Sequence, residues 1–392
     1  MEKIAYRPRN VRETLVELKD ASELAIDLAY AAALYGHEGL AEAVYELEAE
    51  AESLQYPAKI SLMLAAKRAD DAEELVGIIQ IVDAAVAITN AAADIAGIVA
   101  NDIGLPEEVR AALPEADEVV MRASVADGSS AVGQSLADLA LETETGVDVT
   151  AVRRDSKWII TPDDEIKLQA GDLVIGSGPD DGVATAYELL TGEERPAEPR
   201  PQTDVEELRQ AAETVIRLKN IAELAVGLSY GAVLFDDDEL AAEVTELEEQ
   251  SDRLKGDIET WVIEASERVG KPSQLRGVLH LATASEAICD AARDIADIVL
   301  REGDVHPVFG QAVSESDELI TTTTITADSD FADRSLETLE LEERTGMGIM
   351  AIRRSDDWIL APAGETTLRT GDVLIARGPE EGVREIKQQT LE

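Results

Sequence analysis

Residues 168–179 read Leu-Gln-Ala-Gly-Asp-Leu-Val-Ile-Gly-Ser-Gly-Pro, and residues 368–379 read Leu-Arg-Thr-Gly-Asp-Val-Leu-Ile-Ala-Arg-Gly-Pro. The two segments lie 200 positions apart, and the same shift aligns the sequence with itself without a gap from about residue 15 to 187. Self-similarity over that length indicates a duplicated structural unit. The 392 residues therefore form two copies of one plan, and we expect the copies to share a fold and to pack about a pseudo-twofold axis.

The first hundred residues of each copy have the periodicity of helices. From about residue 10 to 104, apolar side chains recur every three or four positions, with breaks near Gly36, at residues 68–71 and at Gly104-Leu105-Pro106. These breaks predict three long amphipathic helices packed up-down-up. The pattern returns in the second copy, so we expect helical bundles at residues 1–105 and 205–303.

A different period begins at about residue 117. Alternating branched residues predict a strand over Val119–Val125, and residues 133–145 predict a helix that ends at Gly146 in a left-handed cap. A hairpin, a further strand and a closing helix follow, at residues 147–154, 158–161, 172–176 and 180–190. The sequence thus predicts an α+β multidomain protein, with two tandem copies of a three-helix bundle followed by a small βαβββα domain. These small domains span 117–190 and 317–390, and the proline-rich residues 191–204 predict an extended linker.

Charge and composition exclude several classes of protein. The 82 acidic residues outnumber the 34 basic ones, and a net charge of −48 removes the attraction on which nucleic-acid binding depends. A hydrophobic content of 45% excludes a disordered chain, and a single cysteine excludes a disulfide framework. The acids either adapt the surface to a salt-rich cytoplasm or form an acidic ligand face. Their even spread, with 10 Lys against 24 Arg, favours adaptation to salt.

The sequence contains neither a catalytic constellation nor an export signal. The three histidines lie in separate contexts, and no Ser/His/Asp arrangement emerges. The N-terminus lacks the profile of a signal peptide, and acids such as Asp83 and Asp94 interrupt every apolar stretch before the roughly 18 residues of a membrane-spanning helix. We therefore expect a soluble cytosolic protein that is not an enzyme.

Both modules are similar to known families. The β-rich domain resembles the TrkA C-terminal domain, the C-terminal lobe of RCK regulators of potassium conductance. The helical domain resembles a PhoU three-helix bundle, on the acidic stagger Glu286-x-x-x-Asp290-x-x-x-Asp294. The segments that carry the first resemblance recur in the second copy and are Val132–Leu136, Glu144–Val147, Ala151–Arg154 and Leu168–Pro179.

Together the modules resemble archaeal PhoU–TrkA-C proteins. This resemblance implies a regulatory protein of a membrane cation channel or transporter, with potassium as the ion, whose lobes pair within the chain and sense a small-molecule effector. No strand–GxGxxG–helix unit precedes either lobe, so NAD or ATP sensing by that route is not expected. The alternative is a PhoU-like metal-binding regulator of phosphate signalling, or a regulator of a magnesium transporter. Further association of two chains into a homodimer is left open.

The acidic stagger is a candidate site for a divalent metal. Acids at i, i+4 and i+8 stack along one helical face, and a partner helix with its own acids would complete an oxygen-ligand cage. Each copy is degenerate in a different helix, because Val86 and Asn90 replace two acids of the stagger and Gly227 replaces the counterpart of Asp27. The residues either bind metal or form solvated faces. The candidates are Glu23, Asp27, Asp94, Glu223, Glu286, Asp290 and Asp294.

Two repeated arginine pairs are candidates for ligand binding. The TrkA-C resemblance implies a cleft between paired lobes that in some members binds a ligand such as cyclic di-adenosine monophosphate, a cyclic dinucleotide. Guanidinium groups suit phosphate oxygens, which points to Arg153, Arg154, Arg353 and Arg354. The alternative is a strand-end pair that balances acids such as Asp155 and Asp356. Adjacent strand residues face opposite sides, so at most one of each pair lines a given cleft.

Overall fold

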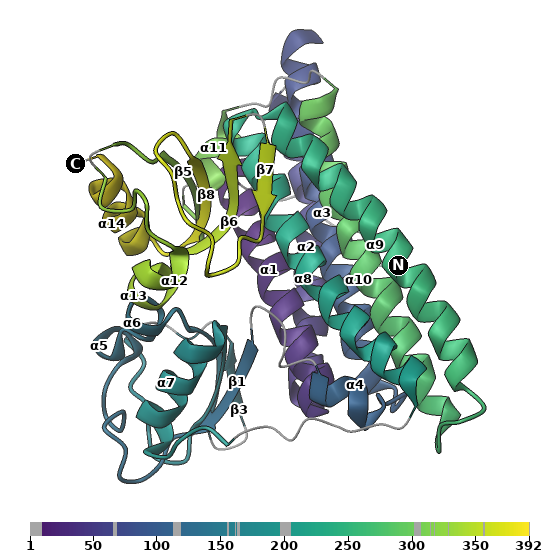
Figure 1. Cartoon of the computed structure of the whole chain (residues 1–392). Helices are drawn as coiled ribbons and strands as arrows, with labels where there is room; N and C mark the ends of the chain where they lie inside the picture. Colours follow the sequence, from purple (N-terminus) through teal and green to yellow (C-terminus); the bar gives the residue numbers. More distant parts are fainter. Residues whose placement is uncertain are drawn as a thin grey trace. The chain divides into compact units, whose positions relative to one another are not determined.

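The structure is a computed structural model of the whole chain (Figure 1). It describes residues 10–65, 69–112, 119–154, 157–160, 162, 165–196, 205–301, 307–313, 315–316, 318–327, 329–355 and 357–391. The chain folds into two compact units, and each unit takes one part from each copy. The helical unit comprises Met1–Leu113 and Arg200–Asp317, and the lobe unit comprises Pro114–Pro199 and Glu318–Glu392.

The helical unit contains the two predicted bundles. Gly36 takes a left-handed conformation with φ 60° and ends the first helix, and Asp236 does the same with φ 53° at the matching position. Pro57 lies inside the second helix. A short helix that the periodicity does not predict follows each bundle, α4 (Glu107–Ala112) and α11 (Val308–Val313). The long helices are α1 (Val11–Tyr35), α2 (Glu38–Ala65), α3 (Ala69–Ala100), α8 (Glu206–Phe235), α9 (Asp238–Ala265) and α10 (Leu275–Leu300).

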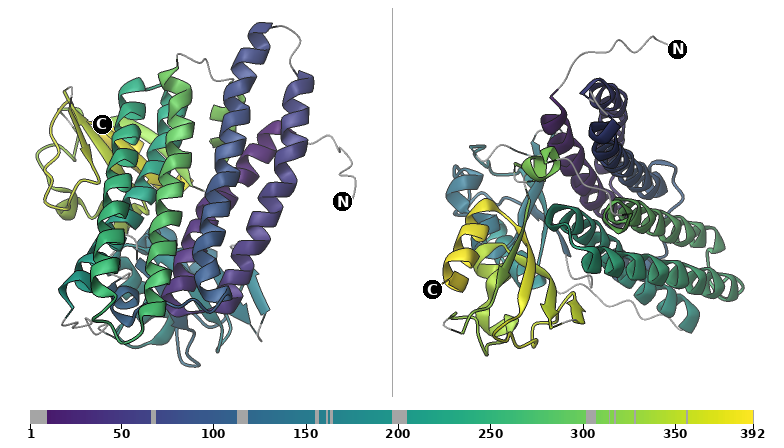
Figure 2. Two further views of the ribbon diagram at one scale, coloured as in Figure 1. Left: turned by 90° about the vertical axis from the view of Figure 1, so that its right-hand side faces the viewer. Right: turned by 90° about the horizontal axis from the view of Figure 1, so that it is seen from above.

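The two bundles pack through α3 and α10, which run side by side in opposite directions (Figure 2). A Cβ atom at Gly77, near the start of α3, would lie 3.0 Å from the side chain of Ile298 near the end of α10. At the other end, a Cβ atom at Gly277 would overlap the carbonyl oxygen of Gly104. Gly277 therefore lets the chain after α3 approach the α10 backbone closely.

Two described segments, Leu75–Ala100 and Glu206–Phe235, are long and apolar enough to cross a membrane by length and composition. This corrects the expectation that acids interrupt every apolar stretch too early for such a span. Most of each segment is buried inside the fold, as in the core helix of a globular protein.

The lobe unit contains two copies of a four-stranded antiparallel sheet, in the orders β1-β4-β2-β3 and β5-β8-β6-β7. In the first lobe, Met121, Val152 and Val174 pack with Val183 of the closing helix in one buried cluster. The first lobe consists of β1 (Val119–Ser124), α5 (Leu136–Leu139), α6 (Leu141–Thr145), β2 (Asp148–Arg154), β3 (Lys157–Ile160), β4 (Leu173–Gly178) and α7 (Asp180–Thr191). The second consists of β5 (Leu319–Thr324), α12 (Leu336–Leu339), α13 (Leu341–Thr345), β6 (Gly348–Arg354), β7 (Asp357–Leu360), β8 (Val373–Gly378) and α14 (Glu380–Leu391).

The helix predicted over residues 133–145 is two short helices in the structure. Ser135 caps α5 by accepting a hydrogen bond from the Asp138 amide, and Ala140 then takes a left-handed conformation with φ 46°. Glu340 repeats this break with φ 47° in the second lobe. The predicted left-handed cap at Gly146 is confirmed, with φ 68°. Periodicity alone does not reveal a left-handed residue that is neither Gly nor Asn.

Candidate functional site

The centre of the helical unit contains two buried ion pairs that the repeat relates to each other. Lys19 Nζ lies 2.6 Å from Glu23 Oε2, and Lys219 Nζ lies 2.5 Å from Glu223 Oε1. The lysine side chains are only 4% and 5% exposed, and both glutamates are 13% exposed. Burying such a pair costs desolvation free energy, which the ion pair offsets only with good geometry.

Each buried ammonium group lies over a tyrosine of the other copy. Lys19 Nζ is 5.7 Å from the ring centroid of Tyr230, and Lys219 Nζ is 5.3 Å from that of Tyr30. Both distances fall within the range of a cation–π interaction. Because the contacts are reciprocal, the two lysines join the two copies about the pseudo-twofold axis.

The tyrosine hydroxyls find different partners in the two copies. Tyr30 Oη lies 2.7 Å from Ser285 Oγ, whereas Tyr230 Oη lies 3.4 Å from Ser22 Oγ. Burial, together with the Glu223 carboxylate, raises the pKa of Tyr30, and burial together with Glu23 raises the pKa of Tyr230. Both hydroxyls therefore stay protonated and act only as hydrogen-bonding groups.

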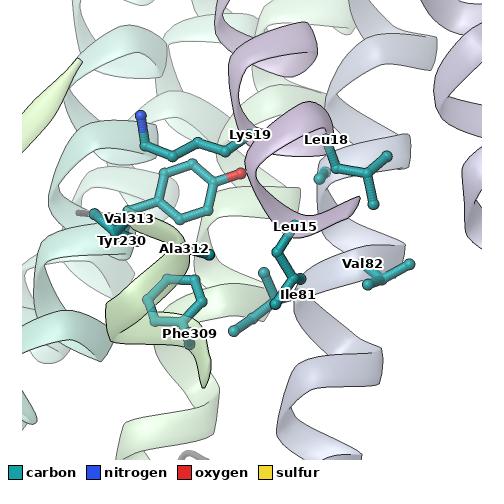
Figure 3. Close-up of a pocket in the computed structure, with 10 residues that line it drawn as sticks. Leu15, Leu18, Lys19, Ile81, Val82, Tyr230, Phe309, Ala312 and Val313 are labelled. Atoms are coloured by element: carbon teal, nitrogen blue, oxygen red, sulfur yellow. The ribbon is translucent and has the colours of Figure 1, made fainter. Parts of the chain in front are cut away.

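A small pocket lies beside Tyr230 (Figure 3). Phe309 of α11 packs against the Tyr230 ring, with the ring centroids 6.2 Å apart, and the stem of Lys19 runs over the same ring. The pocket walls come from α1, α3, α8 and α11. They are formed by Leu15, Leu18, Lys19, Ile81, Val82, Ala85, Tyr230, Phe309, Ala312 and Val313.

The predicted metal-binding acids are distributed over several environments. Glu23 and Glu223 lie in the central ion pairs, Asp27 is half-buried, and Asp94 and Asp294 are exposed. Glu286 accepts an ion pair from Lys255 at 2.9 Å, and Asp290 lies beside Glu248. Within the part of the chain that the structure describes, no three His, Cys, Asp or Glu side chains form a group that would hold a metal ion. The acids as placed therefore do not form the predicted cage, and metal binding by them stays a prediction.

Burial raises the pKa of one acid on α9 and of one acid on α10. Burial raises the pKa of Glu248, and the nearby Arg293, 2.7 Å away, offsets only part of this effect. Burial likewise raises the pKa of Glu286 against the opposing influence of Lys255. These carboxylates are ion-paired components of the second bundle, and each already has a cation as its neighbour.

In both lobes, the second arginine of each predicted pair holds an aspartate of the same lobe. Arg154 donates from Nε to Asp172 Oδ1 at 2.9 Å and from Nη2 to Asp172 Oδ2 at 2.6 Å. A further bond from Nη2 reaches the Lys167 carbonyl oxygen at 2.7 Å. Arg354 makes the same fork with Asp372, at 2.9 and 2.7 Å. Asp172 and Asp372 are 2% and 1% exposed, so each fork is a buried, charge-assisted pair of hydrogen bonds that stabilises the interior of its lobe.

The fork from Arg354 changes the pKa of Asp372. Burial raises the pKa of Asp372, but the hydrogen bonds from Arg354 and from the Arg369 amide outweigh it and hold that pKa below its ordinary value. The partner of Arg354 is thus Asp372, an aspartate 18 residues further along the chain. Asp155 and Asp356, the partners in the alternative interpretation, lie outside the described residues.

The first arginine of each pair lies elsewhere on the hairpin. Arg353 pairs in register with Trp358 on the neighbouring strand, and its guanidinium carbon lies 5.6 Å from the centroid of that ring. Arg153 pairs in backbone register with Trp158 in the first lobe. Both arginines are half-buried. The structure separates the two members of each pair, as adjacent strand residues require, and ligand binding by the four arginines stays a prediction.

The two lobes pack against each other through α6 and α13 (Figure 1). A Cβ atom at Gly146 would lie 3.0 Å from the Glu342 carbonyl oxygen, and one at Gly346 would lie 2.7 Å from the Glu142 carbonyl oxygen. Both glycines also have positive φ, 68° and 66°. Glycine is therefore required twice at each position, by the backbone conformation and by the close approach of the opposite lobe.

The sequence analysis names Glu23 and Glu223 only as metal candidates and misses their buried ion pairs with Lys19 and Lys219. A signal was present, because lysine occurs only 10 times in the chain and Lys19 and Lys219 coincide under the repeat. Each is followed four positions later by a glutamate, which is the helical spacing of an ion pair.

Comparison with known families identifies the modules. The TrkA-C domain model matches residues 120–191 and 320–390, so both lobes belong to that class of regulatory, non-catalytic domain. The PhoU domain model matches residues 215–299, within the second bundle. The chain is therefore a PhoU-like/TrkA-C protein.

Solved structures also show similarity to this chain. The crystal structure of PhoU from Pseudomonas aeruginosa is 15% identical, with a TM-score of 0.41, over 74% of this chain and 96% of that chain. The crystal structure of the GsuK RCK domain is 13% identical, with a TM-score of 0.19, over 80% of this chain and 79% of that chain. A search of curated proteins finds no match.

Proposed function

We propose that this protein is a cytosolic regulator of a membrane cation channel or transporter, with potassium as the transported ion. The observation that carries the proposal is the presence of two TrkA-C lobes in one chain, paired through α6 and α13. A small-molecule effector that binds one arrangement of the paired lobes more tightly than another would shift the population toward that arrangement. The helical unit would pass the change to the transport protein.

The test of this function is potassium transport in cells. Deletion of the gene should change the initial rate of uptake of radioactive rubidium, a potassium analogue, and the wild-type gene should restore that rate. Gly146→Ala should fail to restore it, because it disturbs the contact between lobes. Gly192→Ala is the matched control, since Gly192 is also a left-handed helix cap but has open space around it. Unchanged rubidium uptake in the deletion strain would refute the proposal.

The effector prediction is tested separately by calorimetry on the whole chain. The probe is cyclic di-adenosine monophosphate, whose phosphates suit guanidinium groups. Arg153→Ala with Arg353→Ala should weaken binding at least ten-fold while leaving the Arg154 and Arg354 forks intact. Binding that the double variant leaves unaltered would remove the first arginines from the site.

A second candidate function rests on the PhoU match over residues 215–299. On that hypothesis the chain regulates phosphate signalling or magnesium transport, with a divalent metal as ligand. Deletion would then alter the uptake of phosphate or magnesium and leave rubidium uptake unchanged. Titration of the chain with Mn²⁺ and Mg²⁺ tests the metal directly, and tight binding that Glu286→Ala abolishes would favour this function.

A further inference from the structure

The short helices α4 and α11 are equivalent by the repeat but differ in how they are seated. Each one follows a bundle in the chain and precedes the first strand of a lobe. Each packs mainly on the first long helix of the other copy, α4 on α8 and α11 on α1. Each short helix is thus the connection between a lobe and the helical unit.

Helix α4 and the chain just before it are closely packed against α8 and α10. Leu105 and Val109 are 3% and 0% exposed, and the chain just before α4 lies so close to α10 that only glycine fits at position 277. On this side of the pseudo-twofold axis, Ser285 holds the hydroxyl of Tyr30 at 2.7 Å.

The inner face of α11 is equally buried, with Phe309, Ala312 and Val313 only 3%, 2% and 2% exposed, but it borders a small pocket. The pocket beside Tyr230 lies directly beneath it, with Phe309, Ala312 and Val313 forming one wall. Ala85 stands at the position that Ser285 occupies in the other copy, and the Tyr230 hydroxyl has its serine contact at 3.4 Å. A packed interface that lacks atoms on one side loses dispersion contacts, so the pocket weakens the attachment of α11.

The sequences of the two helices also indicate that α11 is the less stable of the two. Helix α4 reads Glu-Glu-Val-Arg-Ala-Ala, mostly strong helix formers, whereas α11 reads Val-Phe-Gly-Gln-Ala-Val. Gly310 lies at the position of Arg110, in the interior of a helix of only six residues. Its Cβ would meet nothing closer than 3.7 Å, from Leu234 Cδ1, so packing does not require glycine there. Glycine in a helix interior instead favours opening, because it gains more backbone freedom than other residues.

We infer that α11 is a movable joint, which leaves its seat on α1 while the remainder of the helical unit stays folded, and that α4 is a fixed attachment. The two lobes are then unequal, because only the second is connected to the helical unit through an element that opens locally. As a step in signal transmission this inference rests on the proposed function, but the opening itself is a property of the chain alone.

Hydrogen exchange of the full chain, followed by mass spectrometry, tests the joint. After correction for intrinsic rates, amides of α11 should exchange at least ten-fold faster than those of α4 and of α1. Gly310→Ala and, separately, Ala85→Ser should slow α11 several-fold and leave α4 unchanged. The serine hydroxyl can bond within its own helix, as Ser285 does to Leu281. Gly256→Ala, at an open position of α9, is the control and should leave α11 unaltered.

Equal protection of α11 and α1 would overturn the inference, as would an α11 exchange rate that neither Gly310→Ala nor Ala85→Ser alters. Because this experiment involves neither ion transport nor effector, its failure leaves the proposed function standing. A failed uptake experiment likewise leaves the joint standing.

Discussion

Substitution of Lys19 by methionine isolates the energetics of the central ion pairs. Methionine keeps an unbranched apolar stem over the Tyr230 ring, so the change removes the ammonium group and little else. Glu23, which is 13% exposed, then lacks its salt-bridge partner in the core. At the observed 2.6 Å, an effective dielectric constant of 20 gives a gross attraction of about 6 kcal/mol, part of which desolvation cancels. Removing one member of a buried pair typically costs about 3–5 kcal/mol, and we expect Lys19→Met to fall in that range.

The assay is chemical denaturation at fixed salt concentration, with far-UV circular dichroism as the signal. The double variant Lys19→Met/Glu23→Met replaces both charges by apolar groups and should recover most of the lost free energy of unfolding. The Lys219 and Glu223 pair provides an independent repeat of the same cycle. The reasoning is refuted if Lys19→Met costs less than about 1 kcal/mol, the value of an exposed pair, or if the double variant is as unstable as the single one.

Three further predictions follow from the lobes and the acids. Gly146→Ala should lower the thermal midpoint of the lobe unit more than Gly192→Ala, because both strain a left-handed cap but only Gly146 faces the opposite lobe; equal shifts would contradict the assigned contact. Asp372→Asn should cost about 2–3 kcal/mol in denaturation, by weakening charge-assisted hydrogen bonds; because the folded pKa of Asp372 is lowered, its contribution is present above the unfolded value of about 3.9 and is lost as the pH falls through the folded pKa. Glu248 has the opposite sign, since its pKa is raised on folding: acidification through that pKa toward the unfolded value of about 4.3 should stabilise the helical unit, and Glu248→Gln should abolish this gain in a pH series of unfolding experiments.

The features that the sequence predicted are the ones that local physics determines. Helical periodicity predicts three long helices in each copy with a break near Gly36, and Gly146 marks where the chain turns through a left-handed residue. The alternation of strand residues gives the elements of the sheet in their correct order. These signals depend on neighbours within a few positions of the chain, which a single sequence displays directly.

The features that the sequence did not predict depend on partners far apart in the chain. Arg154 bonds Asp172 because the loop before β4 returns to the end of β2, and no spacing rule specifies that return. Lys19 meets Tyr230 only when the two copies pack. Helix α11 has weak helix propensity and forms where α1 provides a surface for it. The prediction of ligand roles for the repeated arginine pairs also missed that Arg154 and Arg354 bind buried aspartates of their own lobes.

The crossed seating of α4 and α11 has a consequence for the duplicated gene. If the same unit assembled as a homodimer of half-length chains, every substitution would appear on both sides of the symmetry axis, and alanine at position 85 could not coexist with serine at the equivalent position. Fusion of the copies into one polypeptide removes that restriction. One half of the duplicated protein can then stay rigid while the other half becomes more mobile. This requires neither a second gene nor the selective pairing of two different subunits.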